Sequence, residues 1–238
     1  MTLIIIFFSL LMTIILYLRP EGKEETRISV PEISAPEIPA PEVSVQEKKA
    51  LFKATIIPAV NEVYSDLMQQ YQEVSKSIRA GDDNDELTAL RKEYKAANND
   101  ELLMALKPHP QSIAIAQAAM ESSWATSRFF KEANNIFGVW SFSENEARLA
   151  ANEKRGDKTI WVKKYSTVAD SIRDYYRTLA RGAGYKEFRI LKMETSDPHE
   201  LVMKLDQYSE KRAEYCEELS AIIRFNKFED YDQPQIAL

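Results

Sequence analysis

One acidic residue, Glu121, lies in a stretch of small apolar residues. The sequence around it reads AQAAMESSWATSRFF, so Ala118, Ala119 and Met120 directly precede the acid. Close apolar neighbours raise the pKa of a carboxyl group, because they desolvate its charged form. A carboxyl that stays protonated near neutral pH can donate a proton to a leaving oxygen. Glu121 is therefore either a general acid or an ordinary solvated acid on a helix surface.

The neighbours of Glu121 at helical spacing are polar or aromatic. A single helix over residues 111 to 129 would place four residues on one face: Gln117, Glu121, Trp124 and Arg128. A core face would be aliphatic, and a solvated face seldom includes tryptophan. The mixed stripe predicts a polar groove in which Gln117, Trp124 and Arg128 contact the substrate.

The helical run ends in ANNIFGVWSF, where two asparagines precede a glycine among aromatic residues. Asparagine caps helices or enters the left-handed region, and Gly138 lets the backbone approach closely. Aromatic rings here offer flat apolar faces for sugars, although such rings more often fill cores. This segment predicts a second set of substrate-binding residues: Asn134, Asn135, Phe137 and Trp140, with Phe142 as a further stacking face.

Composition narrows the classes of protein to consider. A chain of 238 residues that is 45% hydrophobic and 29% charged allows one sizeable domain with attachments. With a net charge of −6, the chain lacks the positive field that supplies most nucleic-acid affinity, so no nucleic acid is expected as a partner. The single Cys216 and the separated His109 and His199 give no metal cluster. No metal and no cofactor are expected, and the oligomeric state stays open.

The N-terminal segment, residues 1–19, is predicted to be a transmembrane signal anchor. Residues 1 to 18 contain no charged side chain and would span about 27 Å as a helix. A cleaved signal peptide is the alternative, but the segment has neither a cationic start nor a small-x-small cleavage signature. Residues 20–46 are rich in Pro and Glu, which predicts an extended linker.

The remaining chain is predicted to be mainly helical. Helical periodicity indicates a helical N-terminal extension over 47–105, in which Pro58 leaves one helix or two equally open. The GDDNDE segment at 81 to 86 predicts a turn with an Asp N-cap. The main domain, 106–232, is predicted to contain a helix over 111–129, a small β element within 143–164, and helices over 168–183, 198–205 and 212–225. Residues 233–238 are predicted to be a disordered tail.

Residues 112 to 142 resemble the catalytic segment of the bacterial glucosaminidases that include the Bax protein family and the flagellar peptidoglycan hydrolases. That family follows approximately the pattern LAQAxxESxWGxSxxAxxxNNxFGxW, in which Glu121 occupies the acid position. Residues 48 to 64 and 165 to 189 extend the similarity toward the Bax branch. Ala125 stands where the family usually has glycine, a change that a helix should tolerate.

The resemblance implies a fold of class α+β, mainly α. The fold would be lysozyme-like, with a helical lobe that carries Glu121, a small β lobe opposite, and a groove between them. The implied reaction is hydrolysis of a β-1,4 bond next to N-acetylglucosamine in peptidoglycan, with Glu121 protonating the departing oxygen. A second carboxylate would activate water, unless the acetamido group of the substrate attacks instead. The candidates are Glu144, Glu146, Glu153 and Asp157, of which Glu146 is preferred.

Two tyrosines complete the expected site. The flagellar branch has a tyrosine-containing segment near its C-terminus, and YSEKRAEY at 208 to 215 offers Tyr208 as the functional tyrosine, in a catalytic or a structural role. Tyr175 is expected to lie near the groove and bind substrate. A lytic transglycosylase and a noncatalytic wall-binding scaffold are the alternative functions.

The expected partners are the glycan strand of peptidoglycan and the cytoplasmic membrane, the latter through residues 1–19. A wall substrate and a long linker place the catalytic domain in the periplasm or otherwise outside the inner membrane, on a single-pass anchor. Arg19, Lys23 and Arg27 favour the opposite orientation by the positive-inside rule.

Overall fold

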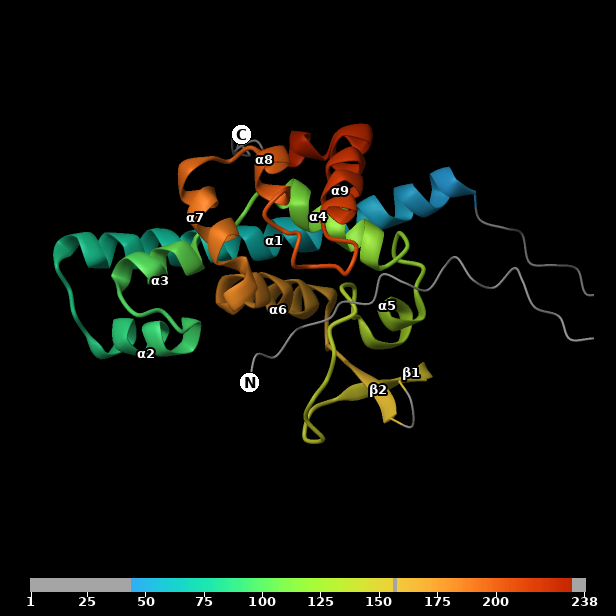
Figure 1. The fold of residues 1–238 in the computed structure, drawn as a ribbon, viewed down its shortest axis with the longest axis horizontal. Coiled ribbons are helices and arrows are strands. Elements are labelled where there is room, and N and C mark those ends of the chain that lie inside the picture. The colour runs from blue at the N-terminus through green and yellow to red at the C-terminus, as the bar shows by residue number, and fades with distance from the viewer. Residues whose placement is uncertain (1–43, 156–157, 233–238) are drawn as a thin grey trace, which may run out of the picture.

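The computed structural model describes residues 44–155 and 158–232, and most of this chain is helical (Figure 1). In chain order the helices are α1 (Val45–Ala80), α2 (Asp85–Tyr94), α3 (Asn99–Leu106), α4 (Gln111–Glu121), α5 (Arg128–Ala133), α6 (Val168–Arg181), α7 (Lys186–Glu194), α8 (Pro198–Val202) and α9 (Ala213–Asn226). Short 3-10 helices η1 (Ala183–Tyr185) and η2 (Phe228–Tyr231) follow α6 and α9. One antiparallel hairpin, β1 (Arg148–Arg155) and β2 (Lys158–Lys163), completes the described part. The predicted class, α+β and mainly helical, is confirmed.

The longest helix, α1, runs unbroken along the molecule (Figure 1). Pro58 lies inside it without ending it, which settles the open choice between one helix and two. A capping box of Ser44 and Glu47 begins the helix, and Gly81 ends it at φ +85°, a conformation that glycine adopts without steric cost. The cap of the next helix is Asn84, whose side chain accepts a hydrogen bond from the Leu87 amide, so the predicted Asp cap is wrong.

The main core surrounds α4, which is buried along nearly its whole length. Residues 111 to 119 of this helix are all buried, and α1 packs against both α4 and α6. Phe52, Ile56 and Val60 of α1 belong to the same cluster of buried residues as Ile113 and Ile115 of α4. The core therefore crosses the predicted boundary between 47–105 and 106–232.

The start of α4 is held by the end of the described chain. Pro110 precedes the helix and supplies no side-chain cap. Asp232 takes this role instead, because its carboxylate accepts hydrogen bonds from the Ser112 amide, at 2.8 Å, and from the Ser112 hydroxyl. The helix that carries Glu121 is thus fixed by a residue far along the sequence.

The β hairpin lies beside α5, on the opposite side of the molecule from α8 and α9 (Figure 1). In its register Leu149 faces Val162, and an irregularity follows Ala150. Trp140 forms an isolated bridge with Val162, which attaches the chain after α5 to the hairpin. The small β element expected within 143–164 is confirmed.

Some predictions differ from the structure or fall beyond it. Helix α7 was not predicted, and α8 ends at Val202 rather than at 205. In the described residues no helix has the length and apolar character required of a membrane span. The predicted anchor over 1–19 and the tail over 233–238 lie outside the described residues, as does the linker up to 43.

Candidate active site

Helix α4 ends at Glu121, so the continuous helix predicted over 111–129 is wrong. The Ser122 hydroxyl donates to the Ala118 carbonyl and accepts from the Ala125 amide at 2.7 Å. A serine that bonds back to the preceding turn competes with the helical hydrogen-bond ladder. The chain then leaves the helix axis, and Glu121 stands at its last position.

The turn after Glu121 passes through three consecutive left-handed residues, Ser123 at φ +51°, Trp124 at +62° and Ala125 at +60°. None of them is glycine, and each such residue costs roughly 1–2 kcal/mol of backbone strain. Ala125 is therefore not an alanine tolerated in a helix, as the sequence suggested. It occupies a backbone conformation that favours glycine.

The predicted stripe beyond Glu121 does not form, because the turn redirects the side chains that follow. The Trp124 ring packs edge-on against Phe52 at 5.2 Å between centroids, and Lys49 Nζ lies 4.5 Å from its centre. Trp124 thus contacts α1 and does not line the cavity beside Glu121. The structure does not place it where a sugar-contacting residue was expected.

A cavity of about 300 Å³ lies at the end of α4, between the helical part and the hairpin. Its wall consists of Glu121, Ser127, Arg128, Phe129, Phe137, Gly138, Trp140, Ala151, Asn152, Ile160 and Val162. Among the side chains that the structure describes, Glu121 is the one carboxylate in this wall. The remainder is largely apolar, with a few groups able to form hydrogen bonds.

The environment of Glu121 favours its protonated form. Burial raises the pKa of Glu121 to about 7, and a hydrogen bond from Tyr215 acts in the opposite direction. The Tyr215 hydroxyl donates to Glu121 Oε1 at 3.0 Å. Near neutral pH this carboxyl is therefore present in both forms, which suits a group that gives up and regains a proton.

Tyr215, which contacts Glu121, was missed by the sequence reasoning. It is fully buried on α9, seven residues after the predicted Tyr208, in the same YSEKRAEY segment. Tyr208 is also fully buried and stacks on Tyr215, with ring centroids 5.5 Å apart. The sequence feature that could have identified Tyr215 is its spacing from Leu219, because residues four apart share one face of a helix and both are buried on α9.

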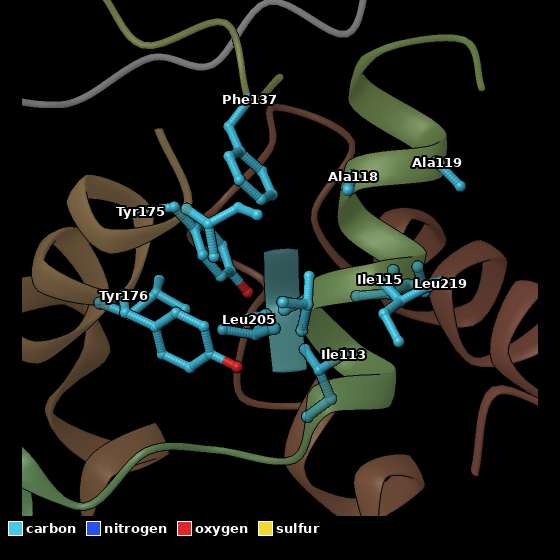
Figure 2. Packing of buried hydrophobic residues seen from close by; sticks show 14 of the residues in the cluster. Ile113, Ile115, Ala118, Ala119, Phe137, Tyr175, Tyr176, Leu205 and Leu219 are labelled. Carbon is cyan, nitrogen blue, oxygen red and sulfur yellow. The ribbon is translucent and has the colours of Figure 1, made fainter. Parts of the chain in front are cut away.

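Gln117 and Tyr175 lie behind Glu121 and not on the cavity wall. Gln117 is 0% exposed, and its amide bonds with the hydroxyls of Tyr175 and Tyr215. Tyr175 is 2% exposed, and its ring stacks on Phe137 at 4.1 Å between centroids (Figure 2). The predicted contacts of Gln117 and Tyr175 with substrate are not what the structure provides, because core packing encloses both side chains.

The two adjacent asparagines brace the segment that follows α5. Asn134 ends α5 at φ +50°, and its amide donates to the Tyr165 carbonyl at 3.1 Å. Asn135 is 1% exposed, accepts from the Val139 amide and donates to the Lys163 carbonyl, both at 2.9 Å. Both amides are used within the protein, so these residues shape the wall without lining it.

Besides Glu121, two predicted substrate-binding residues lie in the cavity wall with part of their surface exposed. Arg128 Nη1 donates to the Ala150 carbonyl at 3.0 Å and to Asn152 Oδ1 at 2.8 Å, which ties α5 to β1. The half-buried ring of Trp140 lies 6.2 Å from that of Phe142, and Phe142 is 71% exposed. Trp140 therefore lines the cavity, and the exposed ring of Phe142 lies next to it, outside the residues of the wall.

The candidates for a second carboxylate are not gathered around Glu121. Glu146 accepts from the Ser141 hydroxyl at 2.7 Å, and this bond lowers the pKa of Glu146 below its usual value. Glu144 is exposed and pairs with Arg148 at 3.4 Å. Neither lines the cavity, while the Glu153 side chain and Asp157 lie outside the described part.

A half-buried acid at the edge of an apolar cavity, between a helical lobe and a hairpin, is typical of glycoside hydrolases. The family model described as "Glucosaminidase: Mannosyl-glycoprotein endo-beta-N-acetylglucosaminidase" matches residues 101–228, more than half of the chain. The chain belongs to this glucosaminidase family. The match includes Glu121, the cavity wall and Tyr215.

Individual proteins with known descriptions are also similar to this chain. Exo-glucosaminidase LytG of Bacillus subtilis (strain 168) is 30% identical over 130 residues, which cover 51% of this chain and 46% of LytG. The chain thus spans about half the length of that relative. Among solved structures, the catalytic domain of the autolysin Auto from Listeria monocytogenes gives a TM-score of 0.49 at 18% identity, over 81% of this chain and 92% of that chain. A peptidoglycan hydrolase from Sphingomonas sp. A1 gives 0.43 at 18% identity, over 54% and 86%.

Proposed function

We propose that this chain is a peptidoglycan hydrolase that cleaves the β-1,4 bond of N-acetylglucosamine within glycan strands. The observation that carries this proposal is Glu121, the one carboxylate in the described wall of an aromatic-rimmed cavity, with a pKa raised to about 7. Membership of the glucosaminidase family supports the sugar and the bond. The narrower resemblance to the Bax branch points to the same reaction.

In this reaction Glu121 protonates the oxygen that leaves the anomeric carbon. Water supplies the new bond to that carbon, so the products are one reducing end and one free hydroxyl. Trp140 and Phe142 would stack on sugar rings at the rim, and Asn152 and Arg128 would bond with their polar groups. The group that attacks or activates water is either the substrate's acetamido oxygen or a carboxylate of the hairpin.

The test is digestion of purified peptidoglycan by the full chain, compared with Glu121→Gln, with mass spectrometry of the new ends. New reducing N-acetylglucosamine ends, absent with Glu121→Gln, are expected. Reducing muramic ends would mean a muramidase, and anhydro-muramic ends a transglycosylase. Failure of the unmodified chain to digest the wall would favour a binding scaffold. Fragment length separates cleavage inside the strand from cleavage at its end.

We further propose that residues 1–19 anchor the protein in the inner membrane by a single pass, with the catalytic domain on the side of the wall. The long Pro/Glu-rich linker and the proposed substrate support this orientation. A reporter fused after Leu238 should be active outside the cytoplasm. Activity confined to the cytoplasm would exclude a wall enzyme.

A further inference from the structure

A continuous chain of hydrogen bonds leads from the core to Glu121. The Tyr175 hydroxyl donates to Gln117 Oε1, Gln117 Nε2 donates to the Tyr215 oxygen at 2.8 Å, and the Tyr215 hydroxyl donates to Glu121 Oε1 at 3.0 Å. The first three of these residues are at most 2% exposed. Water therefore does not compete for the two bonds that join Tyr175, Gln117 and Tyr215.

The direction of the chain follows from what each group is able to donate. A side-chain amide has one oxygen that only accepts and one nitrogen that only donates, whereas a phenol has a single proton. Because Tyr175 donates to the amide oxygen, the amide nitrogen of Gln117 faces Tyr215. The Tyr215 oxygen accepts from it, and its one proton is left for Glu121.

We propose that Tyr175 and Gln117 are positioning residues that fix this direction and so fix which oxygen of Glu121 carries the transferable proton. Since Oε1 accepts from Tyr215, the proton of the neutral acid resides on Oε2. After the proton leaves, the same bond stabilises the carboxylate. This inference rests on the proposed role of Glu121 as the acid.

Phe137 holds the first member of the chain in place. Its ring stacks on Tyr175 with an angle of 9° between the ring planes. Figure 2 shows the two rings side by side, with the Tyr175 hydroxyl directed toward α4. The NNIFG segment therefore acts on the acid in two ways, by shaping the cavity wall and by orienting Tyr175 behind it.

If Tyr175 and Gln117 had a structural role alone, their buried polar groups would need hydrogen-bond partners and nothing more. The positioning role makes a sharper claim, because it ties the pKa of Glu121 to a hydroxyl two side chains away. In Tyr175→Phe the amide of Gln117 is free to turn, and Tyr215 is no longer obliged to donate to Glu121. A lost hydrogen bond of about 0.5–1.5 kcal/mol corresponds to a pKa increase of about 0.5 to 1.

The experiment measures the pKa of Glu121 by carbon-13 NMR of the carboxyl groups in the full chain without substrate, with Glu121→Gln to assign the signal. Tyr175→Phe should raise this pKa by about 0.5 to 1 and move the alkaline limb of the rate profile equally. It should also lower kcat about 3- to 10-fold with KM unchanged. The matched control is Tyr176→Phe, which removes a neighbouring buried hydroxyl that donates to the His109 carbonyl at 3.5 Å and takes no part in the chain of bonds to Glu121.

An unchanged pKa in folded Tyr175→Phe, or an equal change in Tyr176→Phe, would overturn the proposal. If Tyr175→Phe fails to fold, Gln117→Glu keeps the size of the side chain but replaces the donating nitrogen with an acceptor for the Tyr215 proton. Tyr215 then no longer has to donate to Glu121, so an increase of the Glu121 pKa of at least about 0.5 is required of this variant too. The NMR titration needs no activity. A pKa change without any peptidoglycan cleavage would therefore support the positioning and reject the proposed function.

Discussion

Two carboxylates, Glu121 at the end of α4 and Glu146 just before β1, have opposite environments. On the helical side, burial raises the pKa of Glu121 to about 7. On the hairpin side, the hydroxyl of Ser141 lowers the pKa of Glu146 and keeps it ionised. The same side chain thus becomes an acid in one place and a fixed anion in the other, because one is desolvated and the other is hydrogen-bonded.

The two sides also differ in what holds them. The helical side is fixed by contacts between distant segments, since Tyr215 and Gln117 are 98 residues apart and both fully buried. The hairpin side is assembled from a single stretch of chain and is fastened to α5 through Arg128. The proposed proton donor thus has a buried background, whereas the proposed substrate contacts lie on partly exposed side chains.

The largest effect is expected from Glu121→Gln, which removes the carboxyl proton that the proposed reaction transfers. The rate of peptidoglycan cleavage should fall about 10²–10⁴-fold, the usual contribution of a positioned acid. The control is Glu217→Gln, because Glu217 is exposed on α9 and lies outside the cavity wall. A similar loss in both variants, or in neither, would remove Glu121 from the acid role.

The pH dependence should reflect the same acid. Above pH 7 cleavage should decline about tenfold per pH unit, because the pKa of Glu121 is about 7 and the protonated form is required. The effect on stability has a defined sign: the folded pKa exceeds the ordinary value of 4.5, so Glu121 favours folding at low pH and this benefit is lost between pH 4.5 and about 7.

Glu121→Gln should therefore become more stable than the unmodified chain as pH rises through that window. The gain should reach about 1–3 kcal/mol above pH 7, after allowance for the partial exposure of the side chain. Urea denaturation at several pH values measures it. A difference that is constant with pH would contradict the raised pKa.

Trp140→Ala tests the hairpin side of the comparison. A ring contact of about 0.5–1.5 kcal/mol predicts a 2- to 10-fold increase in KM, with kcat much less affected. Phe225→Ala is the matched control, since Phe225 is 80% exposed on α9 and lies outside the cavity wall. A drop in kcat with constant KM would place Trp140 in the chemical step instead.

Glu146→Gln should leave cleavage within about twofold of the unmodified rate, because surface changes away from the site have small effects and Glu146 does not line the cavity. Glu153→Gln and Asp157→Asn, made in parallel, test the other carboxylates of the hairpin. If Glu146→Gln proves as damaging as Glu121→Gln, Glu146 is the group that activates water, and the contrast between the two sides disappears.

The smallest effect is expected from Ala125→Gly, and it concerns stability alone. Glycine adopts the left-handed backbone at φ +60° without strain, although it loses more conformational entropy on folding than alanine. The net effect should be an increase in folding stability of about 0.5–1 kcal/mol. Ala89→Gly, at an exposed position within α2, should instead destabilise the fold by about 1 kcal/mol. Thermal unfolding of both variants measures the difference. Destabilisation by Ala125→Gly would show that the backbone at residue 125 is not strained.

Much of the local structure followed from the sequence. The helical periods placed α1, α6 and α9 within a few residues, and the β element predicted within 143–164 contains the hairpin. The helix predicted over 111–129 was too long, because the Ser122 hydroxyl bonds to the Ala118 carbonyl and the Ala125 amide and so ends α4 early. Three left-handed residues without glycine then turned the chain, and no composition signal marked that turn.

The sequence by itself determined the local surroundings of Glu121, because its apolar neighbours and the motif around it depend only on residues close in the chain. Only the tertiary structure decided which side chains contact the Glu121 carboxyl group. Tyr215 displaced Tyr208 as its partner, and Gln117 and Tyr175 moved from the expected groove into the core. The physical reason is that a buried polar group must find its hydrogen bonds in space, and those partners come from α4, α6 and α9 together.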